Sequence, residues 1–399
     1  MTVRKNEEKI DFSRVIDRRH GNSYKWDVKD NELPMWVADM DFQTAPEIIS
    51  AMQEKVATGV FGYEEVPSDY FAAVQSWMRQ RHHVEAKPDW MIFCTGVVPA
   101  ISSLVRRLTH AGDNVLIQAP CYNIFYNSIV NSGRHVLSSD LVYDEAELAY
   151  HVDYEDLEAK LADPLTNMML FCNPHNPTGH IWTKDEVAKI ASLCCKHHVK
   201  LVSDEIHGDI TFNKEGYNSV LGLEDQTALH NVIALVSPSK TFNVAALHAA
   251  TVIVPDANLR AQASRGLNSE ELAEPNLLAI PGTIAAYEKG GSWLDQLLAY
   301  LKENRQEVSH FLEHNVPSIK WVPGEATYLM WLDVSALTPD GEKFASFLRE
   351  TTGLYLTAGK VYGNGDKFVR MNVACPQKLL EDGLRRLQRG TIKFMRQSN

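Results

Sequence analysis

A lysine follows directly after one of the most apolar stretches of the chain. The run Val232–Val236 ends in the tetrapeptide Ser237–Lys240, which reads Ser-Pro-Ser-Lys. A lysine just beyond a buried strand is partly desolvated, which lowers the pKa of its amine and equips it to form a Schiff base. Ser237 and Ser239 could donate hydrogen bonds to a nearby phosphate. The tetrapeptide alone also fits a solvated loop lysine that follows two turn serines. Other residues of the chain must therefore support a catalytic role for Lys240.

Two further apolar runs end in residues capable of chemistry. Asp204 ends the run that starts at Val199, and a carboxylate there could pair with the cationic nitrogen of a pyridine cofactor. It could equally be a helix N-cap or a surface carboxylate. Asn176 lies in Asn173–Gly179, where two Asn-Pro pairs and a glycine indicate a rigid, extended turn that fixes the angle of the amide. An ordered turn without chemistry is the alternative.

A glycine opens the apolar helix expected over Ile101–Leu108. It lies in Thr95–Ala100, Thr-Gly-Val-Val-Pro-Ala. Backbone N–H groups at such a helix start, aided by the helix dipole, can bind an anion. As a phosphate signal this is much weaker than a Walker motif.

The elements that must position these residues alternate in type between about residues 90 and 255. Short apolar runs separate amphipathic stretches such as Lys184–His197, which predicts a mostly parallel sheet covered by helices on both faces. Ligands of such sheets bind beyond the carboxyl ends of the strands, where Lys240, Asp204 and Asn176 would meet. The clearest runs are Asn114–Gln118, Met168–Cys172, Val199–Ser203, Val232–Val236 and Thr251–Val254.

The pattern changes near residue 292. Apolar residues at helical spacing predict one long helix of about 20 residues, followed by strand-like runs at Tyr328–Leu332 and Phe368–Arg370. A final amphipathic helix is expected from about Gln377. Because 399 residues exceed what one core usually holds, we predict an N-terminal arm (1–45) packing on a small domain, a large domain (46–291) and a smaller α+β domain (292–399).

The composition excludes several classes of partner. A net charge of −12 argues against nucleic acid and anionic membranes, and no apolar stretch is long enough to span a bilayer. The charged N-terminus is unlike a signal peptide, and six cysteines without a C-x-x-C pair fit a reducing cytoplasm. The adjacent pairs His82–His83 and His197–His198 would diverge, so no metal site is expected, and no G-x-S-x-G supports serine hydrolysis.

Ten short motifs occur along the chain, and their combination in this order is specific, although any one of them could occur by chance. They are Pro34–Phe42, Gly62–Tyr63, Thr95–Ile101, Pro120–Tyr122, Cys172–Gly179, Ser203–Asp209, Ser237–Asn243, Trp293–Asp295, Thr327–Asp333 and Phe368–Asn372. Over nearly its full length the chain thereby resembles the class I/II aminotransferase-like enzymes of fold type I, which use pyridoxal 5′-phosphate (PLP). It is most similar to the bacterial cystathionine β-lyase (C–S lyase) subgroup. The resemblance implies an α/β, PLP-dependent transferase fold.

The resemblance assigns roles around the cofactor. Lys240 would bind PLP covalently, Asp204 would pair with the pyridine nitrogen, and Asn176 would hydrogen-bond the ring 3′-oxygen. Tyr122 would stack on the ring, and His207 occupies the position where many aminotransferases have a tyrosine that contacts the 3′-oxygen. The phosphate would be held by the backbone at Val97 and Val98 and by the side chains of Ser237 and Ser239.

Other roles concern the substrate and the assembly. Arg370, with Asn176, would bind the α-carboxylate of an amino acid, and the pocket near Ala38, Tyr63 and Tyr328 would admit its side chain. Tyr63 would reach the phosphate of the neighbouring subunit's site, which implies a homodimer with shared active sites.

Three positions depart from related patterns. Many aminotransferases have a phosphate-binding arginine eight residues after the lysine, where this chain has His248. The lyase subgroup usually lacks that arginine too, so the departure favours a lyase. Ala246 and Ala326 stand where the subgroup has glycine, which leaves the effect on substrate preference open.

The implied reaction is β-elimination from L-cystathionine or a related cysteine S-conjugate. The substrate amine displaces Lys240, the freed amine removes the Cα proton, and a thiolate leaves Cβ, giving a thiol, pyruvate and ammonia. Transamination at the same site is the nearest alternative. A regulatory protein partner with residual PLP binding is a third.

Overall fold

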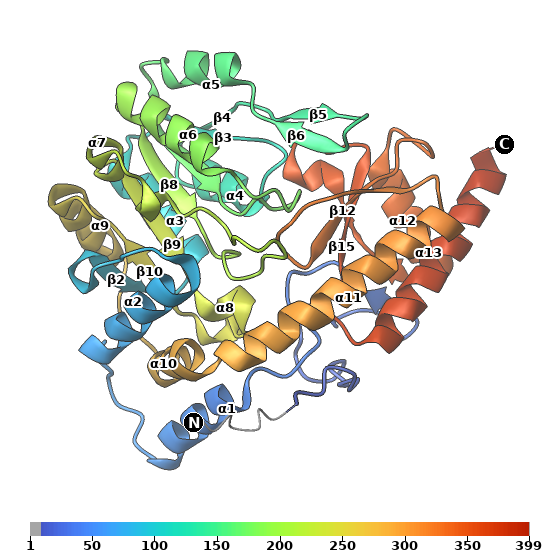
Figure 1. The fold of residues 1–399 in the computed structure, drawn as a ribbon, viewed down its shortest axis with the longest axis horizontal. Helices are drawn as coiled ribbons and strands as arrows, with labels where there is room; N and C mark the ends of the chain where they lie inside the picture. The colour runs from blue at the N-terminus through green and yellow to red at the C-terminus, as the bar shows by residue number, and fades with distance from the viewer. Residues whose placement is uncertain (1–8, 399) are drawn as a thin grey trace.

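A seven-stranded sheet forms the larger part of the protein in the computed structural model, which describes residues 9–398 (Figure 1). The five strands from β9 to β4 are parallel, and β10 runs antiparallel to both of its neighbours. The α/β fold with a mostly parallel sheet is confirmed. In spatial order the strands are β2 (Met91–Cys94), β10 (Ala250–Ile253), β9 (Val232–Val236), β8 (Lys200–Asp204), β7 (Thr166–Cys172), β3 (Asn114–Ile117) and β4 (His135–Ser138).

Helices cover both faces of this sheet, which is why its strands are continuous apolar runs. In β7, Met168 and Leu170 face one core, whereas Met169 and Phe171 face the other. The first core is closed by α3 (Val97–Leu108), α4 (Ile124–Val130) and α9 (Ala257–Ser269). The second is closed by α1 (Pro46–Ala57), α2 (Ser68–His82), α5 (Tyr154–Leu161), α6 (Lys184–Lys196), α7 (Gln226–Leu229) and α10 (Ala279–Lys289). Each fully buried Leu, Met or Phe contributes roughly 1.5–3 kcal/mol.

A long helix, α11 (Gly291–Asn315), leads away from the large sheet toward a second, antiparallel one (Figure 1). It contacts α10 at its start and α13 further along, and its length agrees with the helix predicted from residue 292. The second sheet has the order β11 (Lys320–Val322), β12 (Leu329–Asp333), β15 (Phe368–Asn372) and β14 (Thr357–Ala358). Together with α12 (Gly341–Thr352) and α13 (Gln377–Ser398) it encloses a third core.

The N-terminal segment packs against this second part. Strand β1 (Leu33–Pro34) pairs in parallel with β13 (Leu354–Tyr355). Asp41, 3% exposed, accepts hydrogen bonds from Arg18, Lys25 and Trp26, and its own N–H donates to Ala374 O at 2.9 Å. Residues 1–8 of the expected arm lie outside the described residues, and the domain boundaries stay a prediction.

Several other features bear on the expected properties. The hairpin of β5 (Val142–Asp144) and β6 (Ala149–His151) was not predicted from the sequence. This hairpin carries three potential metal ligands, Asp144, Glu147 and His151, each of which offers one ligand atom within 4.8 Å of the other two. Two of these residues are exposed. All six cysteines are unpaired. No helix within residues 9–398 is both long and apolar enough to cross a membrane.

Candidate active site

A cavity of about 220 Å³ lies beyond the carboxyl ends of β7, β8 and β9. It brings together most of the residues that the sequence singled out. Its lining includes Ala38, Thr95, Gly96, Val97, Val98, Tyr122, Asn176, Asp204, His207, Ser239, Lys240 and His248. Chain segments far apart in the sequence thus meet at the edge where parallel strands present their ligand-binding ends.

Lys240 lies in the one-turn helix α8 (Pro238–Thr241), directly after β9. Its Nζ donates a hydrogen bond of 2.6 Å to Ala38 O. Burial lowers the pKa of the amine to about 8; Asp39 and Asp204 oppose this effect, and Arg370 adds to it. A substantial fraction of the amine is therefore neutral near pH 8, which is the form that acts as nucleophile or base.

Asp204 ends β8, and its side chain is buried at the floor of the cavity. Burial is the largest influence on its carboxyl group and raises the pKa to about 7, while the Ile206 N–H and Lys240 pull it down. Glu205, a second buried carboxyl, raises the pKa of Asp204 further. A carboxylate in this position favours a cationic partner in the cavity.

Asn176 lines the cavity and is hydrogen-bonded to Arg370, which does not itself belong to the lining. Arg370 Nη1 donates to Asn176 Oδ1 at 2.9 Å, and Nη2 donates to Trp36 O at 3.0 Å. Arg370 is 5% exposed, and its guanidinium lies 4.8 Å from the ring centroid of Tyr362. A buried guanidinium with free N–H groups is suited to bind a carboxylate in a bidentate pair.

Two asparagines hold the segment Trp36–Met40 over the cavity. Asn243, just after α8, accepts from Met40 N at 2.9 Å and donates to Met40 O at 3.0 Å. Asn372, on β15, donates to Val37 O and Asp39 O, both at 2.6 Å. Both residues lie within the motifs noted above, yet they were not predicted as site residues, because their partners are backbone carbonyls that carry no residue-type signal.

The start of α3 forms one end of the cavity. Gly96 is its N-cap residue with φ of 156°, and the first N–H groups of a helix have no partner within the helix. Ser239 also lines this end, but Ser237 does not. The Ser237 hydroxyl caps α8 by accepting from Ser239 N at 3.1 Å and donates to Ala249 O at 2.7 Å.

The ring side chains of Tyr122 and His207 complete the wall, whereas that of Tyr328 is fully buried and does not line the cavity. Tyr122 lines the cavity, and burial raises the pKa of its phenol to about 12. Burial lowers the pKa of His207 to about 3, helped by Lys240 and Arg370, so its imidazole is neutral. The Tyr328 hydroxyl donates to Ala38 O at 3.1 Å, the same carbonyl that accepts from Lys240.

Three further sequence-predicted positions, Tyr63, Ala326 and Ala246, do not line the cavity either. Tyr63 is fully exposed at 102% of its reference area and is not among the residues that line the cavity. Ala326 is buried, and its N–H donates to Gly179 O at 2.9 Å, so it packs behind the turn that carries Asn176. Ala246 is exposed beside Ala245 and His248, which do line the cavity.

Comparison with known protein families places most of the chain in one of them. The profile of the family described as aminotransferase class I and II matches residues 33–387. Cystathionine beta-lyase PatB of Bacillus subtilis is 38% identical over 387 residues, covering 95% of this chain and 99% of its own. Protein MalY of Escherichia coli is 34% identical, covering 94% of this chain and 97% of its own.

A solved structure with the same fold contains a cofactor. Cystalysin from Treponema denticola, whose crystal structure contains pyridoxal 5′-phosphate, superposes with a TM-score of 0.92. It is 31% identical, and the match covers 97% of this chain and 100% of cystalysin. The likeness therefore extends over all the elements that form the cavity.

Proposed function

Because the chain belongs to the aminotransferase class I and II family, we propose that it is a PLP-dependent C–S β-lyase of the cystathionine β-lyase type. The observation that carries the proposal is one cavity lined by a low-pKa lysine, a buried aspartate and Asn176, whose amide is hydrogen-bonded to the buried guanidinium of Arg370. The similar proteins named cystathionine beta-lyase and cystalysin support both the cofactor and the reaction.

Two buried polar atoms without hydrogen-bond partners indicate that a polar cofactor and substrate bind beside them. Within the described residues, His207 Nδ1 and Arg370 Nε are buried without a hydrogen-bond partner. Buried polar atoms of native proteins are rarely left unsatisfied. Asp204 would face the pyridine nitrogen, Tyr122 the ring, and Asn176 and His207 the 3′-oxygen. The N–H groups of Val97 and Val98, with Ser239, would hold the phosphate, and Ser237 would act on it through Ser239.

Lys240 would both bind PLP and move the reacting proton. PLP, when bound, supplies an electron sink that stabilises negative charge at the substrate Cα. Asp204 would keep that sink effective, because a carboxylate beside the ring nitrogen would favour the protonated form of that nitrogen. The Lys240 amine, whose pKa is about 8 in the cofactor-free protein, would accept the Cα proton as general base.

Arg370 and Asn176 would orient the substrate so that this proton faces Lys240. Arg370 would bind the α-carboxylate with its guanidinium, and Asn176 would hold the guanidinium in place. The side chain of the amino acid would then extend toward Ala38 and Tyr328, where the C–S bond breaks and a thiolate leaves Cβ. The products would be a thiol, pyruvate and ammonia.

Product analysis distinguishes elimination from transamination. The PLP-loaded protein is incubated with L-cystathionine and no keto acid, and pyruvate, ammonia and thiol are quantified. Elimination gives the three in equal amounts, with homocysteine as the thiol. Release of a 2-oxo acid only when a keto acceptor is added, without thiol or ammonia, would show that the chain is an aminotransferase instead.

The proposal extends to a homodimer in the cytoplasm. Tyr63 is fully exposed, and its neighbours Val60 and Phe61 are 69% and 67% exposed. Apolar surface of this kind favours association. Tyr63 would then complete the phosphate site of the second subunit. Sedimentation analysis of the wild type and Tyr63→Ala tests the dimer. Activity of mixed dimers tests the shared sites, because dimers of one Tyr63→Ala and one Lys240→Ala subunit should regain activity only if each site takes residues from both subunits.

A further inference from the structure

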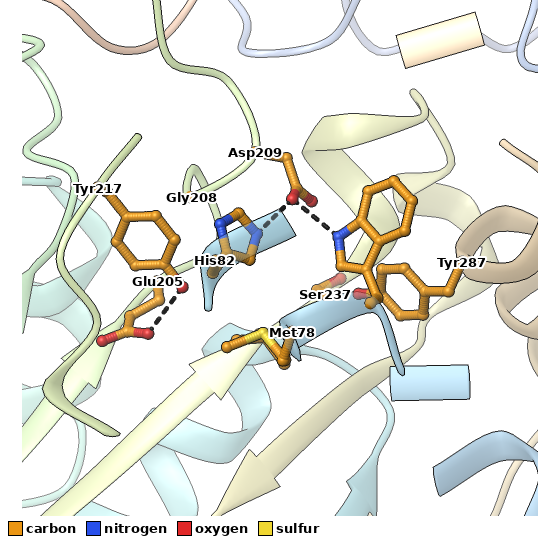
Figure 2. Close-up of a pocket in the computed structure, with 10 residues that line it drawn as sticks. Met78, His82, Glu205, Gly208, Asp209, Tyr217, Ser237 and Tyr287 are labelled. Atoms are coloured by element: carbon orange, nitrogen blue, oxygen red, sulfur yellow. Dashed lines mark hydrogen bonds and ion pairs between the residues drawn. The ribbon is translucent and has the colours of Figure 1, made fainter. Parts of the chain in front are cut away.

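Asp209, another buried carboxylate, does not line the cavity but is hydrogen-bonded to the last residue of α8. Asp209 Oδ1 accepts a hydrogen bond from Trp77 Nε1 at 2.8 Å and lies 2.7 Å from His82 Nε2. Asp209 Oδ2 accepts from Thr241 Oγ1 at 2.6 Å. Figure 2 shows the carboxylate of Asp209 beside the His82 ring, with Tyr217 on the other side of that ring. None of these groups has a part in the reaction described above.

Asp209 is ionised in a place with little water. Its side chain is 9% exposed and that of His82 is 7% exposed. Burial alone would raise the pKa of Asp209, but the hydrogen bonds and charge of His82, with those from Thr241 and Trp77, hold the pKa below its usual value. A buried carboxylate that keeps its charge is an unusually strong hydrogen-bond acceptor, so its bond to Thr241 is a firm anchor.

Thr241 links Asp209 to the catalytic lysine. It follows Lys240 directly, closes the one-turn helix α8 and is fully buried. A helix of four residues has no rigidity of its own. Its N-terminal end is held by Ser237, through the cap on Ser239 N and the bond to Ala249 O. Its C-terminal end is held by Thr241 on Asp209, so Lys240 lies between two fixed points.

The geometry points to Asp209, supported by His82 and Trp77, as a positioning residue that aims the Lys240 amine through Thr241. This inference rests on the proposed function, because it assumes that Lys240 transfers the proton. It means that His82 and Trp77 on α2, and Asp209 in the turn after β8, influence the rate of proton transfer by Lys240. Displacement of a catalytic group by about 1 Å can lower a rate on the order of 100-fold.

The first test exploits the near-identical shapes of threonine and valine. Thr241→Val removes the hydroxyl, and Thr241→Ser keeps it. Thr391→Val is the matched control, since Thr391 is a buried threonine on α13 whose hydroxyl bonds Leu387 O at 2.8 Å. We expect kcat to fall about 10- to 100-fold in Thr241→Val, with KM unchanged, and to recover in Thr241→Ser. An equal loss in Thr391→Val, or full activity in Thr241→Val, would overturn the inference.

The second test needs neither cofactor nor turnover. Acetic anhydride labels the cofactor-free protein, and mass spectrometry compares Lys240 with the exposed Lys378. We expect Lys240 to label at least about threefold faster in Thr241→Val and in Asp209→Asn, because the amine leaves Ala38 O, and at the wild-type rate in Thr241→Ser and Thr391→Val. Unchanged labelling in both Thr241→Val and Asp209→Asn would contradict the positioning role. Failure of the wild type to form thiol or pyruvate would refute the proposed function and leave this result standing.

Discussion

Arg370 Nη1 donates to Asn176 Oδ1 at 2.9 Å, although the two residues lie 194 positions apart in the sequence. Arg370 belongs to β15 of the antiparallel sheet, and Asn176 to the turn that follows β7 of the large sheet. The bond therefore fixes the two parts of the protein to each other at the wall of the cavity. Any change in their relative position would move the carboxylate-binding group.

Arg370→Lys should impair substrate binding specifically. A lysine keeps the charge but loses the planar fork that binds a carboxylate and the Asn176 amide together. We expect KM for L-cystathionine to rise on the order of 100-fold, with the affinity for PLP nearly unchanged. Steady-state kinetics and PLP titration measure both quantities. The control is Arg385→Lys, at an exposed arginine of α13; an unchanged KM in Arg370→Lys would refute the assigned role.

The protonation of Lys240 gives a pH-dependent signal in the cofactor-free protein. Its pKa of about 8 is lowered chiefly by burial, so acylation at Lys240 should show a midpoint near pH 8, measured by mass spectrometry. Arg370→Leu should raise the midpoint, because the charge of Arg370 contributes to the lowering. Since the folded-state pKa lies below the unfolded value of about 10.4, stability should increase as pH rises from 8 to 10. A midpoint above pH 10 would contradict a desolvated amine.

Asp204→Asn should lower kcat and raise the thermal stability of the cofactor-free protein. Burial raises the pKa of Asp204 to about 7, above its unfolded value, so its ionisation costs stability as pH rises through 7. The neutral amide avoids that cost, and the cofactor-free variant should have a higher Tm than wild type at pH 8, with a smaller difference at pH 5. Its kcat should fall on the order of 100- to 1000-fold, since a preorganised charge is lost. Exposed Asp89→Asn serves as the control, and a lower Tm of Asp204→Asn at pH 8 would contradict the assignment.

The sequence predicted those features that depend on local pattern. The parallel strands are short apolar runs because both their faces are buried, and Lys240, Asp204 and Asn176 come together because parallel strands end at one edge. The antiparallel direction of β10 is set by a long connection that leaves no periodic signal. The hairpin of β5 and β6 is equally hidden, because its strands are three residues each and lack a clear alternation.

Long-range polar contacts account for what the sequence could not show. His82 was considered only with its neighbour His83, as a metal ligand, because nothing in the sequence brings it near Asp209, 127 positions away. Asn243 and Asn372 act on backbone carbonyls, which every residue has. The orientation of Ser237 toward Ala249 O also depends on how β9 and β10 pair.

The segment Trp36–Met40 depends on a buried ion pair for its position. Lys25 Nζ lies 2.7 Å from Asp41 Oδ2, and the side chains are 1% and 3% exposed. Asp41→Asn leaves Lys25 with weaker partners and should lower the free energy of unfolding by about 3 kcal/mol, as measured by urea denaturation. Exposed Glu342→Gln, which removes a surface ion pair with Lys360, is the control. A loss no larger than that of the control would show that Asp41 does not hold the segment.

In the proposed reaction Lys240 both carries PLP and moves the Cα proton. Borohydride reduction of the PLP-loaded protein fixes the cofactor on the lysine that holds it, and proteolysis with mass spectrometry locates it. We expect a pyridoxyl group on the peptide that contains Lys240, and neither label nor pyruvate formation from L-cystathionine in Lys240→Ala. A label on another lysine, or pyruvate release by Lys240→Ala at the wild-type rate, would contradict it.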